Sequence, residues 1–477
     1  MGRLFSEDEV RAIIAEATAP LLARIADLEA EVKRLQAEVA RLKKDSSTSS
    51  KPPSSDIVKP PRPEAGGGRR KKRRRGGQPG HERHQRPPYP PEEVDRTRLY
   101  ECSLAELGAE WKPLEQFRVM QQVDLVEKPF VVVEHRARLY RSRRTGEIVA
   151  APLPKHVVAA GLVGPRLSAL IAYLKGGCHV SIRSLQTLLA DVFHLPLSTG
   201  QVAKILRKAS SALETCHLQL RSTLPGQSRL NVDETGHPEC GQRLWAWCFH
   251  APGPAGFSWF HIDAARSSEV LQEFLGETFH GILGCDYFSA YRKFLAETNV
   301  VMQFCWAHLV RDVKFLTTLT DMVTRRFGEK LLAEIKSLFR LWHRRATVST
   351  PRWQRATARA KAAILAQARH APRRSEAQNI AERFQQHGRF YFTFLDAPGV
   401  EPTNNAAERA IRFQTIDRKI TQGTRGEIGR RWCERIWTVL ATCRQQGRSA
   451  FEFLHQSILA LFARRDPPSL LTEPPNP

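Results

Sequence analysis

Apolar residues near the N-terminus recur at alternating spacings of three and four residues, which predicts a helix over residues 1–44 that begins near residue 7. β-branched residues fall at the a positions of this heptad and leucines at the d positions, a choice that favours a parallel two-stranded coiled coil. A lone amphipathic helix packed on its own domain is the alternative. The seam predicts a homodimer or higher oligomer through residues 21–42, and its members are Leu21, Ile25, Leu28, Val32, Leu35, Val39 and Leu42.

The hydrophobic periodicity stops after this helix, and residues 45–95 are rich in Ser, Pro, Gly and Arg. Such a segment buries too little apolar surface to fold alone, so we expect a disordered basic linker. Its unbroken basic run has three interpretations: solvated charge, a localisation signal, or an arm that lies on DNA phosphates. The run alone does not distinguish between them. The run consists of Arg69, Arg70, Lys71, Lys72, Arg73, Arg74 and Arg75.

Two further regions precede the centre of the chain. Residues 96–160 contain alternating β-forming residues, which predict a small β-rich domain. Residues 161–227 change to helical periodicity, and their third helix is capped and basic; a helix-turn-helix-like DNA-binding domain and a helical spacer both fit this pattern. The predicted strands are 117–126, 130–139 and 147–150. The basic residues of the third helix are Lys204, Arg207 and Lys208.

Residues 228–315 alternate between strand and helix periods in the order β-β-β-α-β-α-β-α. This is the layout of ribonuclease-H-like folds. A basic helical insertion over 316–395 separates this region from residues 396–430, and residues 431–477 are expected to form C-terminal helices and a tail. The fold class is therefore a multidomain α+β protein. One face of the second strand is expected to be buried, because aromatic residues alternate along it at Trp245, Trp247 and Phe249.

The 477 residues carry a formal net charge of +24. A charge of this size does not stabilise a fold, so it favours a polyanionic partner, above all nucleic acid, over a merely solvated basic surface. The nine cysteines form no Cys-x-x-Cys pair, which fits a reducing cytoplasm and excludes a disulfide framework. No apolar stretch is long enough to cross a bilayer, so no membrane partner is expected.

Three carboxylates stand where carboxylates are not expected by default. Asp233 and Asp286 each end a short apolar run, and Glu408 lies one turn into a helix that Thr403 or Asn404 would cap. Two strand-end aspartates and a helical glutamate can converge on a pair of Mg²⁺ ions, because hard cations prefer oxygen ligands and two of them can clamp a phosphodiester. Mn²⁺ would be able to substitute for Mg²⁺.

Glu234 follows Asp233 along the same strand. Neighbouring residues of a strand point to opposite faces, so Glu234 is expected to face away from the metal.

The chain resembles a bacterial transposase of insertion sequence family 66, a DDE-type enzyme, over nearly its whole length. The order of the shared motifs argues against coincidence. The resemblance implies that Asp233, Asp286 and Glu408 are the catalytic triad of a transposase that binds the double-stranded ends of an insertion sequence and cleaves and joins DNA. It also implies accessory transposition proteins as partners. The motifs lie at residues 49–56, 76–81, 150–154, 164–167, 232–236, 305–309 and 404–412.

The chain departs from the family at a small zinc-binding module of two Cys-x-x-Cys knuckles. Only Cys102 remains of the four cysteines, and residues 140–145 contain none. Tetrahedral zinc needs four ligands, so no zinc is expected.

Three residues near the triad are candidates for DNA contact, each with an alternative. His308 follows a predicted strand and, with Cys305, would fit a metal site; it is otherwise a DNA contact, a group that tunes a carboxylate, or a structural histidine. Arg409 and Arg412 flank Glu408 at helical spacing and are either phosphate contacts or surface charge. Asn404 and Asn405 are expected to be cap and turn residues.

Two other functions remain open at this point. A transposase-derived protein that binds DNA without cutting it would keep the coiled coil, the arm and the helix-turn-helix. A ribonuclease-H-like nuclease of RNA would need none of these. The intact carboxylates favour the enzyme, because carboxylates near phosphates are unfavourable without metal.

Proline at Leu28 and Leu35 tests the coiled coil. Each proline costs roughly 3 kcal/mol in a helix interior, so we expect the double variant to lose self-association and light scattering to report the monomer mass. The same mass before and after substitution would show that another surface forms the oligomer.

Overall fold

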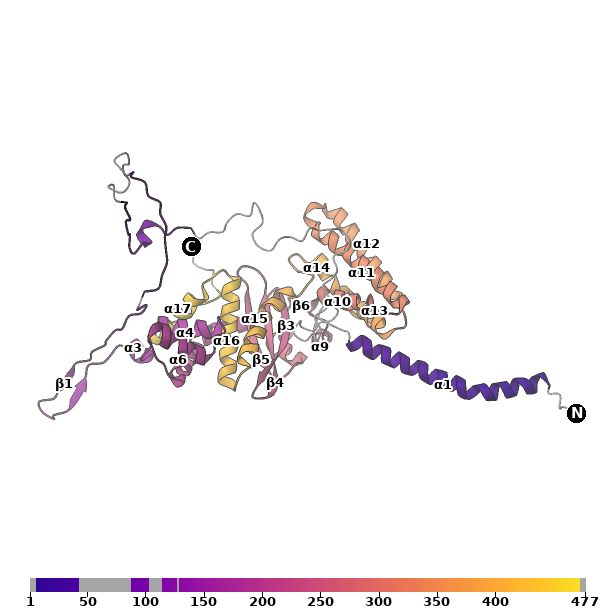
Figure 1. Ribbon diagram of the computed structural model, residues 1–477, viewed down its shortest axis with the longest axis horizontal. Coiled ribbons are helices and arrows are strands. Elements are labelled where there is room, and N and C mark those ends of the chain that lie inside the picture. Colours follow the sequence, from indigo (N-terminus) through magenta and orange to yellow (C-terminus); the bar gives the residue numbers. More distant parts are fainter. Residues whose placement is uncertain (1–5, 43–86, 103–113, 127, 472–477) are drawn as a thin grey trace. The chain divides into compact units, whose positions relative to one another are not determined.

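The computed structural model describes residues 6–42, 87–102, 114–126 and 128–471. The chain divides into two compact units, residues 61–136 and a larger unit of residues 1–60 and 137–477. The larger unit combines helices with a mixed sheet (Figure 1). The basic run of residues 69–75 lies outside the described residues, so its role stays a prediction.

The described residues of the 61–136 unit contain a short 3-10 helix, η2 (Pro91–Glu93), and no strand. The side chain of Gln121 bonds to both backbone groups of Tyr89, at 2.6 and 2.8 Å. Residues 117–126 form no strand, so the strand predicted there is wrong. Of residues 130–139 only Leu139 belongs to a strand, so most of that prediction is wrong too. A strand needs a hydrogen-bonded neighbour, and alternation without one does not make a sheet.

Helix α1 (Glu7–Leu42) forms where the heptad pattern predicts it. Pro20 lies inside it, one residue before the seam begins. The seam side chains from Leu21 to Val39 are all exposed, by 47% or more. An exposed apolar stripe of this length is unfavourable in water, so the helix offers a face that a partner can cover.

Five strands of the larger unit form one sheet in the order β5-β4-β3-β6-β7. The first three are antiparallel, whereas β3, β6 and β7 are parallel. A separate hairpin pairs β1 (Leu139–Arg141) with β2 (Ile148–Ala150), close to the strand predicted at 147–150. The strands of the sheet are β3 (Arg229–Glu239), β4 (Gln242–Ala251), β5 (Phe257–Asp263), β6 (Ile282–Cys285) and β7 (Val301–Phe304).

Helices cover both faces of the sheet (Figure 1). On one face, Trp437 of α16 packs edge-on against Phe260 of β5. On the other, Tyr291 of α9 packs edge-on against Trp247 of β4. The expectation of one buried face on the second strand is thus incomplete, because its small residues face a helix too: Ala246 and Cys248 are as buried as Trp247. The covering helices are α7 (Glu214–Ser222), α8 (Ser268–Phe274), α9 (Ser289–Glu297), α15 (Asn405–Thr421) and α16 (Glu427–Gln445).

A helical bundle precedes the sheet in sequence and is completed by the last helix of the chain. The predicted helices over 161–227 are confirmed. Helix α17 (Ala450–Ala463) packs against α3, α4 and α6. Residues that precede the sheet in sequence and residues near the end of the chain therefore share one apolar core. Lys155–Gly176 is apolar enough to span a membrane, but it is split into two helices that are each too short for this. The bundle helices are α3 (Lys155–Ala160), α4 (Pro165–Gly176), α5 (Ile182–Phe193) and α6 (Thr199–Ala212).

The predicted helical insertion follows β7. Helices α10 and α11 pack together, and α11 packs on α12 (Figure 1). The chain returns to the sheet through α14 and enters α15. The helices of this region are α10 (Trp306–Leu316), α11 (Met322–His343), α12 (Thr350–Arg369), α13 (Ser375–His387) and α14 (Thr393–Asp396), and the remaining 3-10 turns are η3 (Gly276–Thr278), η4 (Arg345–Thr347) and η5 (Gly388–Tyr391).

Gly284 of β6 lies where a side chain would break a contact between the sheet and α15. A Cβ atom there would approach Nδ2 of Asn231 to 2.4 Å, and that nitrogen donates to Asn404. We expect Gly284→Ala to lower the free energy of unfolding by about 1–3 kcal/mol, measured by urea denaturation.

Gly200→Ala is the matched control, because the nearest atom to its Cβ would be 4.0 Å away. It should be neutral or slightly stabilising, since alanine favours helix. Equal effects of the two substitutions would mean that Asn231 moves aside freely.

Candidate active site

Asp233 and Asp286 come from neighbouring parallel strands. Asn231 of β3 pairs with Gly284 of β6, so two residues further along both strands lead to Asp233 and Asp286. Asp286 lies just beyond the end of β6, where its carboxylate accepts the backbone N–H of Phe288 at 2.9 Å. The parallel pairing therefore brings the two aspartates to the same edge of the sheet.

Glu408 enters from the first turn of α15, a helix that packs along β3 and β4. Its Oε1 atom is 3.6 Å from Nδ1 of His308. Both atoms are buried, and neither has a hydrogen-bond partner among the described residues. Because a buried polar atom without a partner is unfavourable, these two atoms mark a place where a ligand is expected.

The carboxylates are close enough to disturb one another's titration. Burial, followed by the charges of Glu234, Asp286 and Glu408, raises the pKa of Asp233 well above its ordinary value. Burial and the charge of Glu234 raise the pKa of Asp286 to about 6, and Glu408 adds to this effect. Like charges held together in this way are typical of sites that bind a cation.

Glu234 is on the opposite face of β3, as the strand alternation predicts. Burial alternates along β3, and Glu234 falls in register with the buried residues Leu230 and Val232. Its carboxylate forms an ion pair with Arg266 at 2.8 Å and accepts a hydrogen bond from the hydroxyl of Tyr291 at 2.5 Å. Glu234 is thus already paired, although its charge still reaches both aspartates.

Asn404 holds α15 against the sheet. Its side chain donates to the carbonyl of Val232 at 2.8 Å and accepts from Asn231 at 2.9 Å, and its backbone N–H donates to Sγ of Cys305 at 3.2 Å. The expected capping role of its side chain is wrong: Asn404 is at the N-cap position, but this side chain makes no capping bond. It bonds instead to the strand that carries Asp233.

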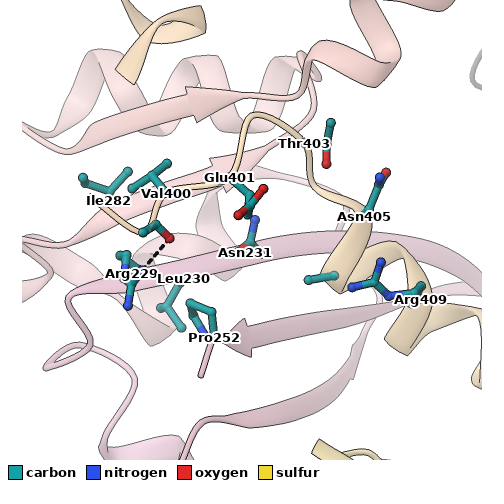
Figure 2. A pocket seen from close by; sticks show the side chains of 13 residues that line it. Arg229, Leu230, Asn231, Pro252, Ile282, Val400, Glu401, Thr403, Asn405 and Arg409 are labelled. Carbon is teal, nitrogen blue, oxygen red and sulfur yellow. Dashed lines mark hydrogen bonds between the residues drawn. The ribbon is translucent and has the colours of Figure 1, made fainter. Parts of the chain in front are cut away.

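A cavity of about 380 Å³ lies beside this contact (Figure 2). Asn231 and Gly284 form its floor on the sheet, and Thr403, Asn405 and Arg409 line it from the start of α15. The cavity also contains the carboxylate of Glu401, so its hydroxyl, amide and guanidinium donors are opposed by one negative charge.

The candidate DNA-binding residues differ in what they present. Lys204 and Arg207 are exposed on α6, and Arg409 and Arg412 are exposed on α15. The ammonium of Lys208 donates to the carbonyls of Ala159 and Ala160, at the end of α3, so it has partners within the fold, and its contact with DNA stays a prediction. Those carbonyls are otherwise unpaired at a helix end, so the fold itself uses this charge.

His308 points to the carboxylates. Burial, with the charges of Arg311 and Arg383, lowers the pKa of His308 to about 4, so the ring is neutral at neutral pH. A neutral imidazole can accept a proton or bind a metal. The sequence motif flagged this histidine, but its position beside Glu408 depends on the packing of α10 and α15.

The donor set fits divalent metal. The charges of Asp286 and Glu408 both raise the pKa of Asp233, an effect that a cation of double charge would relieve. Cys305, His308 and Glu408 form a second possible set, with ligand atoms within 4.8 Å of one another. The sequence suggested a metal at Cys305 and His308, but it did not add Glu408, which comes from a segment far along the chain.

Comparison with known proteins places these residues in one family. Residues 160–431 match the family described as "Transposase IS66 family", and residues 3–87 match a "Family of unknown function (DUF6444)". The chain is 26% identical over 413 residues to "Uncharacterized protein y4qI" of Sinorhizobium fredii, covering 76% of this chain and 72% of that protein. It is 24% identical over 359 residues to "Uncharacterized protein y4hP" of the same organism, covering 68% and 64%.

Removing one of the repelling charges should stabilise the metal-free protein. At pH 8 Asp286 is ionised in both the folded and the unfolded state, and its raised pKa of about 6 means that this charge destabilises the fold. Asp286→Asn should raise Tm by about 2–4 °C for each kcal/mol of repulsion removed. The gain should disappear as pH falls through 6 toward 4, because the parent carboxyl is then neutral.

Addition of Mn²⁺ should raise the Tm of the parent at pH 8 and leave that of Asp286→Asn nearly unchanged. Asp396→Asn, at an exposed position in α14, is the control and should behave like the parent. A lower Tm for metal-free Asp286→Asn would contradict the repulsion.

Proposed function

The chain belongs to the transposase IS66 family, and from this we propose that it is a DDE-type DNA transposase that binds the ends of an insertion sequence and catalyses metal-dependent strand cleavage and strand transfer. One observation carries the proposal. Asp233 and Asp286 follow paired positions of neighbouring parallel strands, and the pKa of Asp233, raised first by burial and by Glu234, is raised further by Asp286 and Glu408. The family match covers Asp233, Asp286 and Glu408.

We further propose that the core is ribonuclease-H-like. Support comes from the strand order β5-β4-β3-β6-β7, with three antiparallel strands followed by two parallel ones. In this layout the carboxyl ends of the central strands meet at one edge, where two aspartates can share a cation. The helical insertion then separates β7 from the helix that carries Glu408.

Asp233, Asp286 and Glu408 would hold two Mg²⁺ ions, with Mn²⁺ as a substitute. The ions would neutralise phosphate charge and lower the pKa of a bound water or 3′-hydroxyl. The residues of the chain do the rest: Asn404 fixes α15 to the strand of Asp233, and the Arg266–Glu234 pair keeps a fourth carboxylate out of the cluster. Phosphoryl transfer needs mainly such positioning and charge neutralisation.

DNA would follow the basic residues around the site. Arg409 and Arg412 are exposed on the helix of Glu408, and Lys204 and Arg207 are exposed on α6. The run Arg69–Arg75 would add sequence-independent phosphate contacts as an arm. The helices over 161–227 would serve as the helix-turn-helix-like reader of the insertion-sequence ends.

The exposed seam of α1 supports a coiled coil that pairs two chains, and so two DNA ends. Accessory transposition proteins would complete the complex, in the cytoplasm and at the nucleoid. The degenerate cysteine module around Cys102 is not proposed to hold zinc.

A DNA-binding protein without cleavage activity is the alternative. It has no need for a cluster of partly buried carboxylates, which destabilises the protein in the absence of metal. The cluster therefore favours the enzyme.

Charge-removing variants of the triad test the enzyme directly. Asp233→Asn, Asp286→Asn and Glu408→Gln keep the shape but replace a carboxylate with a neutral amide, a poor ligand for Mg²⁺. Each should reduce Mg²⁺-dependent nicking of a duplex that carries the element's own ends by at least about a thousandfold, a loss near 4 kcal/mol. Binding to the same duplex should be retained.

Glu427→Gln is the matched control, since Glu427 is also an acidic residue in the first turn of a helix and is exposed. It should cleave like the parent. Glu234→Gln is less suitable, because it also removes the partner of Arg266. Cleavage by Glu408→Gln at the parent's rate would refute the triad, and a parent that binds the ends but never cuts with Mg²⁺, Mn²⁺ and accessory proteins would establish the alternative.

A further inference from the structure

Three side chains with different donor atoms meet behind the carboxylate cluster. Cys305 follows β7 at the start of α10, His308 is one turn further along, and Glu408 faces them from α15. Their ligand atoms all lie within 4.8 Å of one another. Sulfur, imidazole nitrogen and carboxylate oxygen are the ligands of zinc-type transition metals, whereas Mg²⁺ selects oxygen alone.

The distance between two of these atoms fits shared coordination and not a hydrogen bond. Nδ1 of His308 and Oε1 of Glu408 are 3.6 Å apart, too far for a hydrogen bond, and both are buried without a partner among the described residues. Two ligands at about 2.1 Å from one tetrahedral ion are separated by roughly 3.4 Å. A single ion between the two atoms would satisfy both.

The surroundings of Cys305 suit a metal-bound thiolate. The side chain is 2% exposed, and Sγ accepts the backbone N–H of Asn404 at 3.2 Å. Burial raises the pKa of the Cys305 thiol to about 11, and the amides of Asn404, His308 and Ala307 oppose this only in part, so the thiolate forms only with a cation bound. Backbone N–H groups directed at sulfur are the outer contacts that stabilise a ligating thiolate.

We propose that Cys305, His308 and Glu408 form a site for a zinc-type divalent ion, separate from the Mg²⁺ site that Glu408 shares with the two aspartates. Binding releases the thiol proton of Cys305 to solvent, so that one thiolate and one carboxylate neutralise the double charge of the ion. The neutral imidazole supplies the third bond, and water completes the fourth position.

Glu408 belongs to both sets, and this gives the site a consequence that rests on the proposed function. A carboxylate that is bound between Cys305 and His308 is withdrawn from Asp233 and Asp286. Occupancy by a zinc-type ion therefore inhibits the Mg²⁺-dependent reaction, and a chelator restores it.

Cobalt(II) is the probe for the site itself, used with the full-length, metal-free protein and no DNA. We expect one Co²⁺ per chain to give a near-ultraviolet thiolate-to-cobalt charge-transfer band, and Zn²⁺ to displace this Co²⁺. Cys305→Ser keeps an acceptor for the N–H of Asn404 but removes the soft ligand, so the band should be lost. His308→Asn should weaken Co²⁺ binding by at least about tenfold.

Cys433→Ser is the matched control, because Cys433 is also a buried cysteine but lies in α16. It should retain the band. Absence of the band from the parent, or its persistence in Cys305→Ser, would overturn the site.

The inhibitory consequence is measured as the ratio of nicking rates with and without Zn²⁺ at fixed Mg²⁺. Zn²⁺ should slow nicking at least tenfold for the parent and for Cys433→Ser. It should slow nicking much less for Cys305→Ser. Equal ratios for parent and Cys305→Ser would overturn the coupling. A parent that shows the cobalt band but never nicks DNA would refute the proposed enzyme and leave the site intact, so the two failures are distinguishable.

Discussion

Repulsion among Asp233, Asp286 and Glu408 is the constraint on which the rest of this structure depends. Burial comes first and the charge of Glu234 second in raising the pKa of both aspartates, and the charge of Glu408 raises both further. The fold has to overcome this repulsion through packing elsewhere, and aromatic contacts on both faces of the sheet do so. A site that is strained when empty binds a cation more strongly, which links the instability of the cluster to its proposed use.

The frame that holds the carboxylates consists of neutral amides. Asn404 bonds to the backbone of β3 and to Asn231, so α15 is fixed to the strand of Asp233 without adding charge. Gly284 leaves room for this pair, because any side chain there would collide with Asn231. Glu234 is paired with Arg266 on the other face of the sheet, yet its charge still raises the pKa of both aspartates. Position and charge are therefore set by different residues.

Local signals in the sequence were sufficient to predict much of this. Strand β5 has the predicted bounds, and the three carboxylates stood out because each ends a short apolar run or lies near a helix start. Strand β3 was predicted only to Asp233 but continues to Glu239, because pairing with β4 carries polar residues that look like a turn in isolation. The strands predicted at 117–126 and 130–139 were wrong for the opposite reason. Their alternating pattern is present, but no neighbouring strand pairs with it.

Contacts between distant segments could not be predicted in this way. Nothing near Lys208 in the sequence shows that its ammonium ends on the carbonyls of Ala159 and Ala160. The cluster of Cys305, His308 and Glu408 was equally hidden, since the insertion places Glu408 far from the other two. Pairings of this kind depend on the tertiary fold, whereas the spacing of residues along one element does not.

The insertion itself explains how so long a detour leaves the site undisturbed. The chain leaves the sheet after β7 and comes back to the same place: Gln303 of β7 donates to the carbonyl of Tyr391 and accepts the N–H of Phe394. The backbone N–H of Trp306, at the start of α10, donates to the carbonyl of Pro402, just before α15. The start of the detour is thus bonded to its end, and α10 and α15 begin side by side. What lies between these bonds can vary in length without moving Glu408, whereas loss of the Gln303 side chain would remove two of the three bonds that hold this return.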